Sequence, residues 1–395
     1  MIPEIRANFN ANYTDSKFKE LLEFIESKYP KELEFRVAET PVFFDTTLSR
    51  KLIEASEKIV DAILAPDFMS QSKSAIPSQC YVPGNEGRPH FMAFDFGICK
   101  DEAGMMVPQL IELQGFPTLF GFQEFLGRAY ESVFDIPENF TMYFNGHTHD
   151  SYLSLLKRVI IGENNVENVV LMDIKPAIQK TRIDFKIMED YLGIPIVDFF
   201  EIRAEGKKLY YERGGRKIFI HRIFNRLIFD DLQQQKDTPS FDIFKEYDIE
   251  WITHPNWFYR ISKFTLPFLN FDFVPRTLFV STLSEYPKDL ENYVLKPLYS
   301  FSGQGVIIDV SASDIDMIKD KENWILQRKV KYEPVIDTPE GGVQCEIRMI
   351  YIWDENKPRP EPALNLMRMS RGKMIGVRYN KDFNWVGATM GFFQK

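Results

Sequence analysis

The sequence predicts a mixed α/β protein in which a small parallel sheet precedes a larger antiparallel one. Between residues 152 and 225, apolar strands alternate with amphipathic helices, which is the rhythm of a βαβ unit. Residues 292–395 contain mostly strand-like segments, and the alternation of residues 346–353 is typical of an antiparallel sheet with one buried face. A chain of 395 residues is long enough for two or three domains, which we place at 1–150, 151–250 and 251–395.

Composition narrows the class of protein. The formal net charge of −9 argues against a nucleic-acid partner or an anionic membrane surface. The three cysteines, Cys80, Cys99 and Cys345, form no paired motif, so neither a disulfide framework nor a zinc site is expected. The first residues are polar, and no apolar run is long enough to span a bilayer. We therefore expect a cytoplasmic protein.

The elements follow from local patterns. Apolar residues recur at helical spacing in residues 17–29, 46–64, 123–132, 152–159, 181–192 and 313–319. Residues 67–90 are rich in Ser, Pro and Gly and indicate a long loop. We expect a hairpin at 208–211 and 217–224 around Gly214 and Gly215, and a helix from Pro255 that presents Lys263. The remaining strands are predicted at 91–97, 108–117, 168–174, 194–199, 293–297, 306–310, 324–330, 344–353, 363–368, 374–379 and 388–393.

Two early strands carry oxygen side chains that suit Mg²⁺. Asp95 is the one charge of strand 91–97, while Glu112 and Gln114 occupy alternate positions of the next strand and share a face. A hairpin would bring the three side chains together, and Mg²⁺ binds such oxygens together with substrate phosphate. The same residues also fit charges at strand ends that face water.

A small-residue loop at residues 300–305 follows the predicted strand that carries Lys296. Gly303 and Gly305 allow close backbone approach, so the loop amides could wrap an anion beside the lysine. An ordinary β-hairpin turn explains the same residues. The loop is not a Walker motif, because no Gly-Lys-Ser/Thr opens a helix there.

Two further polar clusters are weaker indicators of a functional site. His147 and His149 lack further metal-ligand spacing and indicate a polar loop. His221, Arg222 and Arg226 lie near a predicted strand end, where they could receive a substrate carboxylate or form surface ion pairs.

The order of these features resembles an ATP-grasp domain: Lys263, Lys296, a Ser/Gly loop and then residues 325–330. At the front of the chain, Asp95 followed by Glu112, Gln114, Pro117 and Thr118 is similar to the metal motif of the circularly permuted ATP-grasp enzymes, of which glutathionylspermidine synthase is a member. The resemblance covers roughly residues 85–395. It implies an ATP-grasp fold in permuted order, with metal-binding strands in 1–150, a βαβ pre-ATP-grasp-like lobe in 151–250 and antiparallel nucleotide-binding lobes in 251–395.

The resemblance also implies roles for single residues. Two lysines, the loop and a hinge segment would bind ATP: Lys263, Lys296, Ser302, Gly303, Gln304, Gly305, Gln327, Lys329 and Val330. Asp95, Glu112 and Gln114 would hold Mg²⁺, and Arg378 or Arg348 would stabilise the transferring phosphoryl group.

The implied activity is an ATP-dependent ligation of a carboxylate to an amine through an acyl phosphate. Two residues differ from the motif of that family. Gln114 replaces the Asn of the family motif, and Ala93 replaces an arginine two residues before the metal aspartate. These departures keep open a second hypothesis, a nucleotide-binding protein that does not ligate and acts as a scaffold or partner subunit. A third hypothesis is an enzyme that does not use ATP.

Overall fold

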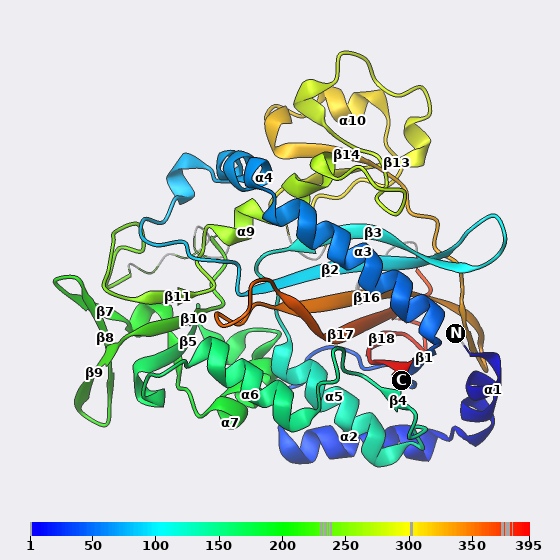
Figure 1. Ribbon diagram of the computed structural model, residues 1–395, viewed down its shortest axis with the longest axis horizontal. Helices are drawn as coiled ribbons and strands as arrows, with labels where there is room; N and C mark the ends of the chain where they lie inside the picture. Colours follow the sequence, from blue (N-terminus) through cyan, green and yellow to red (C-terminus); the bar gives the residue numbers. More distant parts are fainter. Residues whose placement is uncertain are drawn as a thin grey trace.

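A computed structural model describes residues 2–229, 232, 235, 237, 239–300, 303–372, 375, 380 and 382–395. Within this part of the chain the fold is mixed α/β with several antiparallel sheets, as predicted. In Figure 1 an antiparallel sheet runs through the middle and helix α3 crosses it. A small lobe lies above this sheet, and a parallel sheet lies to its left. The α-helices are α1 (Pro3–Asn12), α2 (Asp15–Lys28), α3 (Thr46–Leu64), α4 (Pro66–Gln71), α5 (Phe120–Val133), α6 (His149–Ile160), α7 (Arg182–Leu192), α9 (Trp257–Arg260) and α10 (Ala312–Asp316).

The central sheet joins the front of the chain to its end. Its strand order is β18-β17-β16-β2-β3, and β15 pairs with β16. The predicted hairpin of β2 and β3 is confirmed, with a bulge after Asp95. Strand β16 pairs antiparallel with β2, which lies some 250 residues earlier in the chain. The strands are β2 (Phe91–Lys100), β3 (Met106–Gln114), β15 (Ile336–Thr338), β16 (Gly341–Ile352), β17 (Glu361–Ser370) and β18 (Gly387–Thr389).

The predicted βαβ unit is confirmed as a parallel sheet of order β11-β10-β5-β6. Its strands are β5 (Val169–Asp173), β6 (Ile196–Asp198), β10 (Arg222–Asn225) and β11 (Glu250–Ile252). A capping box of Thr148 and Ser151 starts helix α6, and Gly193 at φ 73° ends helix α7. The predicted strand 217–224 is wrong as one element. It divides at His221, because β9 (Arg216–Ile220) pairs with β8 (Lys208–Arg213) and β10 enters the parallel sheet. Strand β7 (Arg203–Glu205) completes the hairpin sheet.

A three-stranded antiparallel sheet forms the small lobe, in the order β12-β14-β13. Its strands are β12 (Thr277–Phe279), β13 (Tyr293–Pro297) and β14 (Trp324–Arg328). The predicted strand 306–310 is absent. Only Ile307 bridges Leu295, through two backbone hydrogen bonds of 2.9 Å each. The lobe has its own apolar cluster, separate from the cores under the central and parallel sheets.

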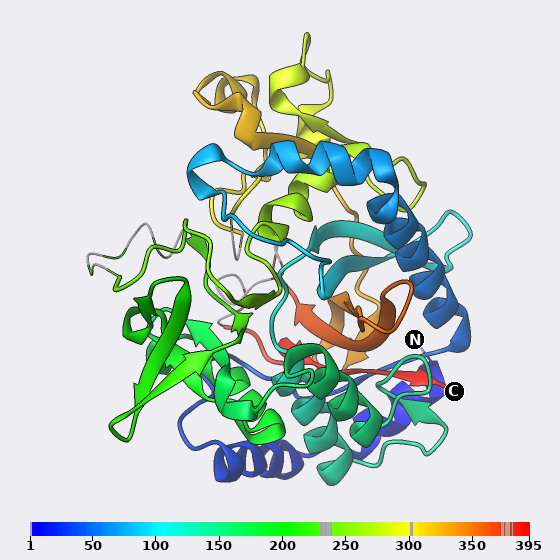
Figure 2. The ribbon, with the colours of Figure 1, turned by 60° about the vertical axis from the view of Figure 1, so that its left-hand side comes forward.

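The N-terminal helices pack on the body of the molecule. Figure 2 shows α2 beneath α5 and the two chain termini near one another. A three-stranded sheet of β1 (Val42–Phe44), β19 (Gly391–Gln394) and β4 (Phe140–Thr141) ties the start of the chain to its end. Sequence patterns did not predict α1, β1 or β12, which are short or weakly periodic.

Other boundaries differ from prediction for identifiable reasons. Residues 67–90 are not one loop, since they contain most of α4 and the 3₁₀ turns Ser72–Ala75 and Ser78–Cys80. The predicted strand 388–393 divides at Met390 between two sheets. The helix expected from Pro255 to Lys263 ends at Arg260 because Ile261 adopts extended backbone, so Lys263 begins a separate 3₁₀ helix (Lys263–Phe268). Residues 374–379, apart from Ile375, lie outside the described residues.

In the part of the chain that the structure describes, no helix combines the length and the apolar character needed to cross a bilayer.

Candidate active site

Lys296 connects the small lobe to the central sheet. Its ammonium group donates to Gln327 Oε1 at 2.5 Å on the neighbouring strand β14. It also donates to the Ile111 carbonyl oxygen of β3 at 3.3 Å. Lys296, one of the predicted ATP-binding residues, therefore extends from the small lobe to the backbone next to Glu112.

Lys263 reaches the same region through a close backbone contact. The Gly115 N–H donates to the Ile261 carbonyl oxygen at 2.7 Å, directly after β3. A Cβ atom on Gly115 would lie 2.6 Å from the Trp257 carbonyl oxygen, so only glycine fits this approach. Lys263 follows two residues after Ile261, and its ammonium group donates to the Ser300 carbonyl oxygen at 2.9 Å.

The charges of both lysines act on the Glu112 carboxylate. Its side chain is partly exposed. Burial would raise the pKa of Glu112, but the charges of Lys263 and Lys296, with those of Arg368 and Arg348, lower it to about 2. Burial in turn lowers the pKa of Lys296 to about 8, against the opposing effect of Glu112. The structure thus brings Lys263, Lys296 and Glu112 together, from three separate segments.

Asp95 is held by arginines. The side chain is fully buried, and the register of β2 with β16 places Arg348 directly opposite. Arg348 donates to both carboxylate oxygens, from Nε to Oδ1 and from Nη2 to Oδ2, each at 2.6 Å. Arg368 of β17 adds a third bond to Oδ2 at 3.1 Å. This is a bidentate, charge-assisted pair.

Glu346 and Arg368 complete the polar face of the central sheet. The two residues are paired across β16 and β17, and Arg368 donates to Glu346 Oε1 at 2.7 Å. Burial raises the pKa of Glu346 to about 7; Asp95 and Glu112 also raise it, while Arg368 and Arg348 oppose the change. From the sequence, no role was assigned to Glu346 or Arg368. The available signal was a lone charge in the apolar segment 363–369.

The three side chains predicted to hold Mg²⁺ are not equally suited to binding a cation. Glu112 and Gln114 are partly exposed and adjacent, with Gln114 Nε2 donating to Glu112 Oε1 at 3.0 Å. Asp95 does not fit, because guanidinium groups already occupy both of its oxygens. Two of the three side chains are therefore suited to a cation, and the third is committed to an ion pair.

Arg222 and Arg226, predicted together as substrate residues, lie at opposite ends of β10. Arg222 donates to both Glu250 oxygens at 2.6 Å and to Glu355 at 3.1 Å. It therefore forms the ion pairs that were the alternative to carboxylate recognition. His221, next to it, is exposed.

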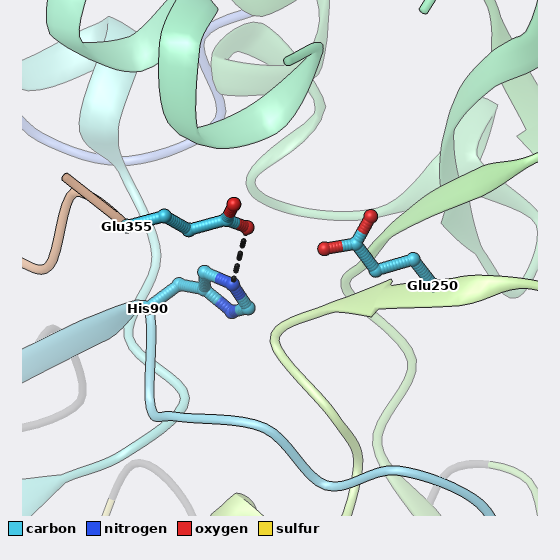
Figure 3. Close-up of side chains that lie close together, drawn as sticks. All are labelled: His90, Glu250 and Glu355. Atoms are coloured by element: carbon cyan, nitrogen blue, oxygen red, sulfur yellow. Dashed lines mark ion pairs between the residues drawn. The ribbon is translucent and has the colours of Figure 1, made fainter. Parts of the chain in front are cut away.

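Glu250 and Glu355 lie beside His90, as Figure 3 shows. Among the described residues, this is the group of three His, Cys, Asp or Glu side chains close enough to hold a metal ion. His90 Nε2 lies 3.9 Å from Glu355 Oε1. Because Arg222 already forms ion pairs with both carboxylates, we assign no metal to this group.

The predicted loop and hinge residues lie in the small lobe. Gly303 and Gly305 have φ of 70° and 73°, and Gln304 between them is exposed. Gln327 is buried and its Nε2 has no partner in the described structure. Lys329 donates to the Glu291 carbonyl oxygen at 2.6 Å and to Asp309 at 3.3 Å, while Val330 is partly exposed. The predicted residues Ser302 and Arg378 lie outside the described residues.

Comparison with known proteins gives evidence on the fold alone. No model of a known protein family matches the chain, and no curated protein matches its sequence. Among solved structures, the chain is similar to the apo form of a glutathione synthetase-like effector from Globodera pallida. The TM-score is 0.59 at 10% sequence identity, over 95% of this chain and 96% of the other. The likeness indicates an ATP-grasp-like fold, in agreement with the resemblance in the sequence.

Proposed function

We propose that the protein is an ATP-dependent ligase that joins a carboxylate to an amine through an acyl phosphate, on a circularly permuted ATP-grasp fold. The observation that carries the proposal is the convergence of Lys263 and Lys296 on Glu112, where the small lobe meets the central sheet. Cations that are brought to one point from separate segments suit the phosphates of a nucleotide. The fold shared with a glutathione synthetase-like protein supports the same class of activity.

In this proposal the residues of the site act by neutralising charge. Lys263 and Lys296 would neutralise charge as the γ-phosphoryl group moves to the carboxylate of the acid substrate. The backbone amides of Gly303 to Gly305 would cover the phosphates. The amine then attacks the acyl phosphate, which releases phosphate and leaves an amide. Such a reaction needs positioned cations more than a nucleophile and base, which fits the residues present.

Arg348 compensates for Ala93 in this proposal. Ala93 removes the arginine of the family motif from β2, but Arg348 presents a guanidinium group to Asp95 from the neighbouring strand β16. The cation is therefore retained from another segment. Arg348, or the alternative Arg378, would stabilise the transferring group.

Mg²⁺ bound by Glu112 and Gln114 would contribute charge neutralisation of the phosphates. Gln114 would offer its amide oxygen, since its Nε2 donates to Glu112. Asp95 is not part of this set, because Arg348 and Arg368 hold it.

Calorimetric titration with ATP tests the proposal. Lys296→Met should weaken ATP binding at least tenfold, because it removes one partly buried cation from the site. Lys321→Met is the matched control in the same lobe, since Lys321 contacts Tyr286 at 3.4 Å instead of the site. An unchanged affinity in folded Lys296→Met protein would refute the nucleotide role.

A second candidate function is nucleotide binding without ligation, as scaffold or partner subunit. The ion pair that occupies Asp95 favours it, because the acid lacks a free oxygen for a metal. ADP release over a panel of acids and amines separates the two. Turnover that depends on both substrates supports the ligase, whereas ATP binding with no turnover across the panel supports the scaffold.

A further inference from the structure

Buried polar side chains at the carboxyl edge of the parallel sheet each carry one atom without a hydrogen bond. Asn225, Arg226 and Thr253 are 1%, 7% and 2% exposed, respectively. Within the described residues, Asn225 Nδ2, Arg226 Nε and Thr253 Oγ1 make no hydrogen bond. Nearly all buried polar groups in proteins are paired, and leaving one unpaired costs about 1–3 kcal/mol. Three such atoms at one edge therefore leave donors for a ligand or for water.

Two of these residues directly follow neighbouring strands of the sheet. Phe224 of β10 pairs with Ile252 of β11 in parallel, and Asn225 and Thr253 are the next residues of the two segments. Asn225 Oδ1 accepts the Leu227 N–H at 3.0 Å, which fixes the orientation of the amide. The atom left over on Asn225 is therefore the donor, Nδ2.

Arg226 links this edge to the loop after β3. It donates to the Pro117 carbonyl oxygen, and its guanidinium carbon lies 5.0 Å from the centre of the Phe116 ring. The next residue, Thr118, carries a further buried hydroxyl without a partner. This loop begins directly after Gln114, so the edge is continuous with the candidate active site.

One of the acids near Arg226, Asp184, is engaged by other contacts. Burial lowers the pKa of Arg226, Asp184 and Asp173 oppose this effect, and the charge of Arg348 lowers the pKa further. Asp184 accepts three backbone N–H groups, those of Leu119, Gly121 and Phe122, at 2.8–3.1 Å. Because Asp184 is engaged at the start of α5, Arg226 retains an N–H group for another acceptor.

We propose that this edge binds a carboxylate group of the acid substrate, an inference that rests on the proposed ligase function. The four unpaired groups, on Thr118, Asn225, Arg226 and Thr253, can all donate, and an ionised carboxylate accepts only. Ligands of open α/β sheets bind outside the carboxyl ends of the strands. The site keeps Arg226 from the predicted substrate set but not His221 and Arg222, which lie at the other end of β10.

Glutarate and its uncharged diamide are the probes that test the inference. Glutarate should raise the melting temperature in a concentration-dependent way, and the diamide should not. Asn225→Asp keeps the oxygen that accepts the Leu227 N–H but replaces the donor with a second acceptor. This variant should lose at least tenfold in glutarate affinity, measured by calorimetry.

If Asn225→Asp fails to fold, a second pair of variants tests the same site. Thr253→Val removes only the hydroxyl and should weaken glutarate binding, whereas Thr253→Ser retains it and should bind like the wild type. Equal binding of glutarate and diamide, or wild-type affinity in Asn225→Asp and Thr253→Val, would show that the edge holds only water.

Parallel ATP titrations distinguish failure of this inference from failure of the proposed function. ATP binding that depends on Lys296, without glutarate binding, overturns this inference alone, and glutarate binding without ATP binding overturns the proposed function alone.

Discussion

The candidate active site has two sides that use charge differently. On the arginine side, Asp95 and Glu346 are buried and bonded to Arg348 and Arg368 at 2.6–3.1 Å. On the lysine side, Glu112 is partly exposed, and the lysines near it are bonded to backbone and amide oxygens. On the arginine side the charges pair with one another, whereas the lysine ammonium groups donate to neutral carbonyl and amide oxygens. Charge that is already paired stabilises the sheet, and the less completely paired charge is where binding is expected.

Breaking the arginine side should have the largest effect on stability. Arg348→Met leaves Asp95 buried with one remaining bond, and an uncompensated buried charge costs about 3–5 kcal/mol. Chemical denaturation measures the loss. Asp95→Asn combined with Arg348→Met removes the stranded charge and should recover part of it. A loss below about 1 kcal/mol in the single variant would mean that the pair contributes little to folding.

The two glutamates should give opposite pH dependences of stability. The folded-state pKa of Glu346 is raised from 4.5 to about 7, so its contribution is full below pH 4.5 and is lost as pH rises to about 7. The folded-state pKa of Glu112 is lowered from 4.5 to about 2, so its contribution is present above pH 4.5 and is lost as pH falls.

Glu346→Gln should therefore gain stability relative to the wild type between pH 5 and pH 8, by about 1–3 kcal/mol. Denaturant midpoints at the two pH values give the difference. Glu112→Gln provides the contrast, since it should lose its stabilising charge at pH 8 and approach the wild type near pH 2. Parallel pH profiles for the two variants would contradict the division into two sides.

An exposed ion pair should have the smallest effect. Arg328 and Asp289 lie 3.4 Å apart in the small lobe, with side chains 52% and 41% exposed. Arg328→Met should change the free energy of unfolding by about 0–1 kcal/mol, because solvent screens the pair. Comparing this variant with Arg348→Met in the same denaturation assay tests burial as the source of the difference. A loss as large as that of Arg348→Met would exclude this explanation.

Local patterns predicted the elements of the site better than their contacts. The hairpin of β2 and β3 followed from alternation over adjacent segments, and Lys296 was expected on its strand. The position of Lys263 was wrong in detail, because Gly115 binds the Ile261 carbonyl oxygen and the helix ends before the lysine. Arg368 was missed since a single charge in an apolar strand has no local partner to reveal it.

The sequence by itself determined the classes of element, the parallel βαβ unit and the set of lysines, acids and glycines from which a site could be built. These features depend on spacing within a few tens of residues, which periodicity records. Only the tertiary structure decided that Arg348 binds Asp95, and that Asn225 and Thr253 follow neighbouring strands at one sheet edge. Such contacts depend on the register between strands, and Arg348 and Asp95 are 253 residues apart in the chain. Local alternation fixes which face a side chain occupies but does not specify its partner on a distant strand.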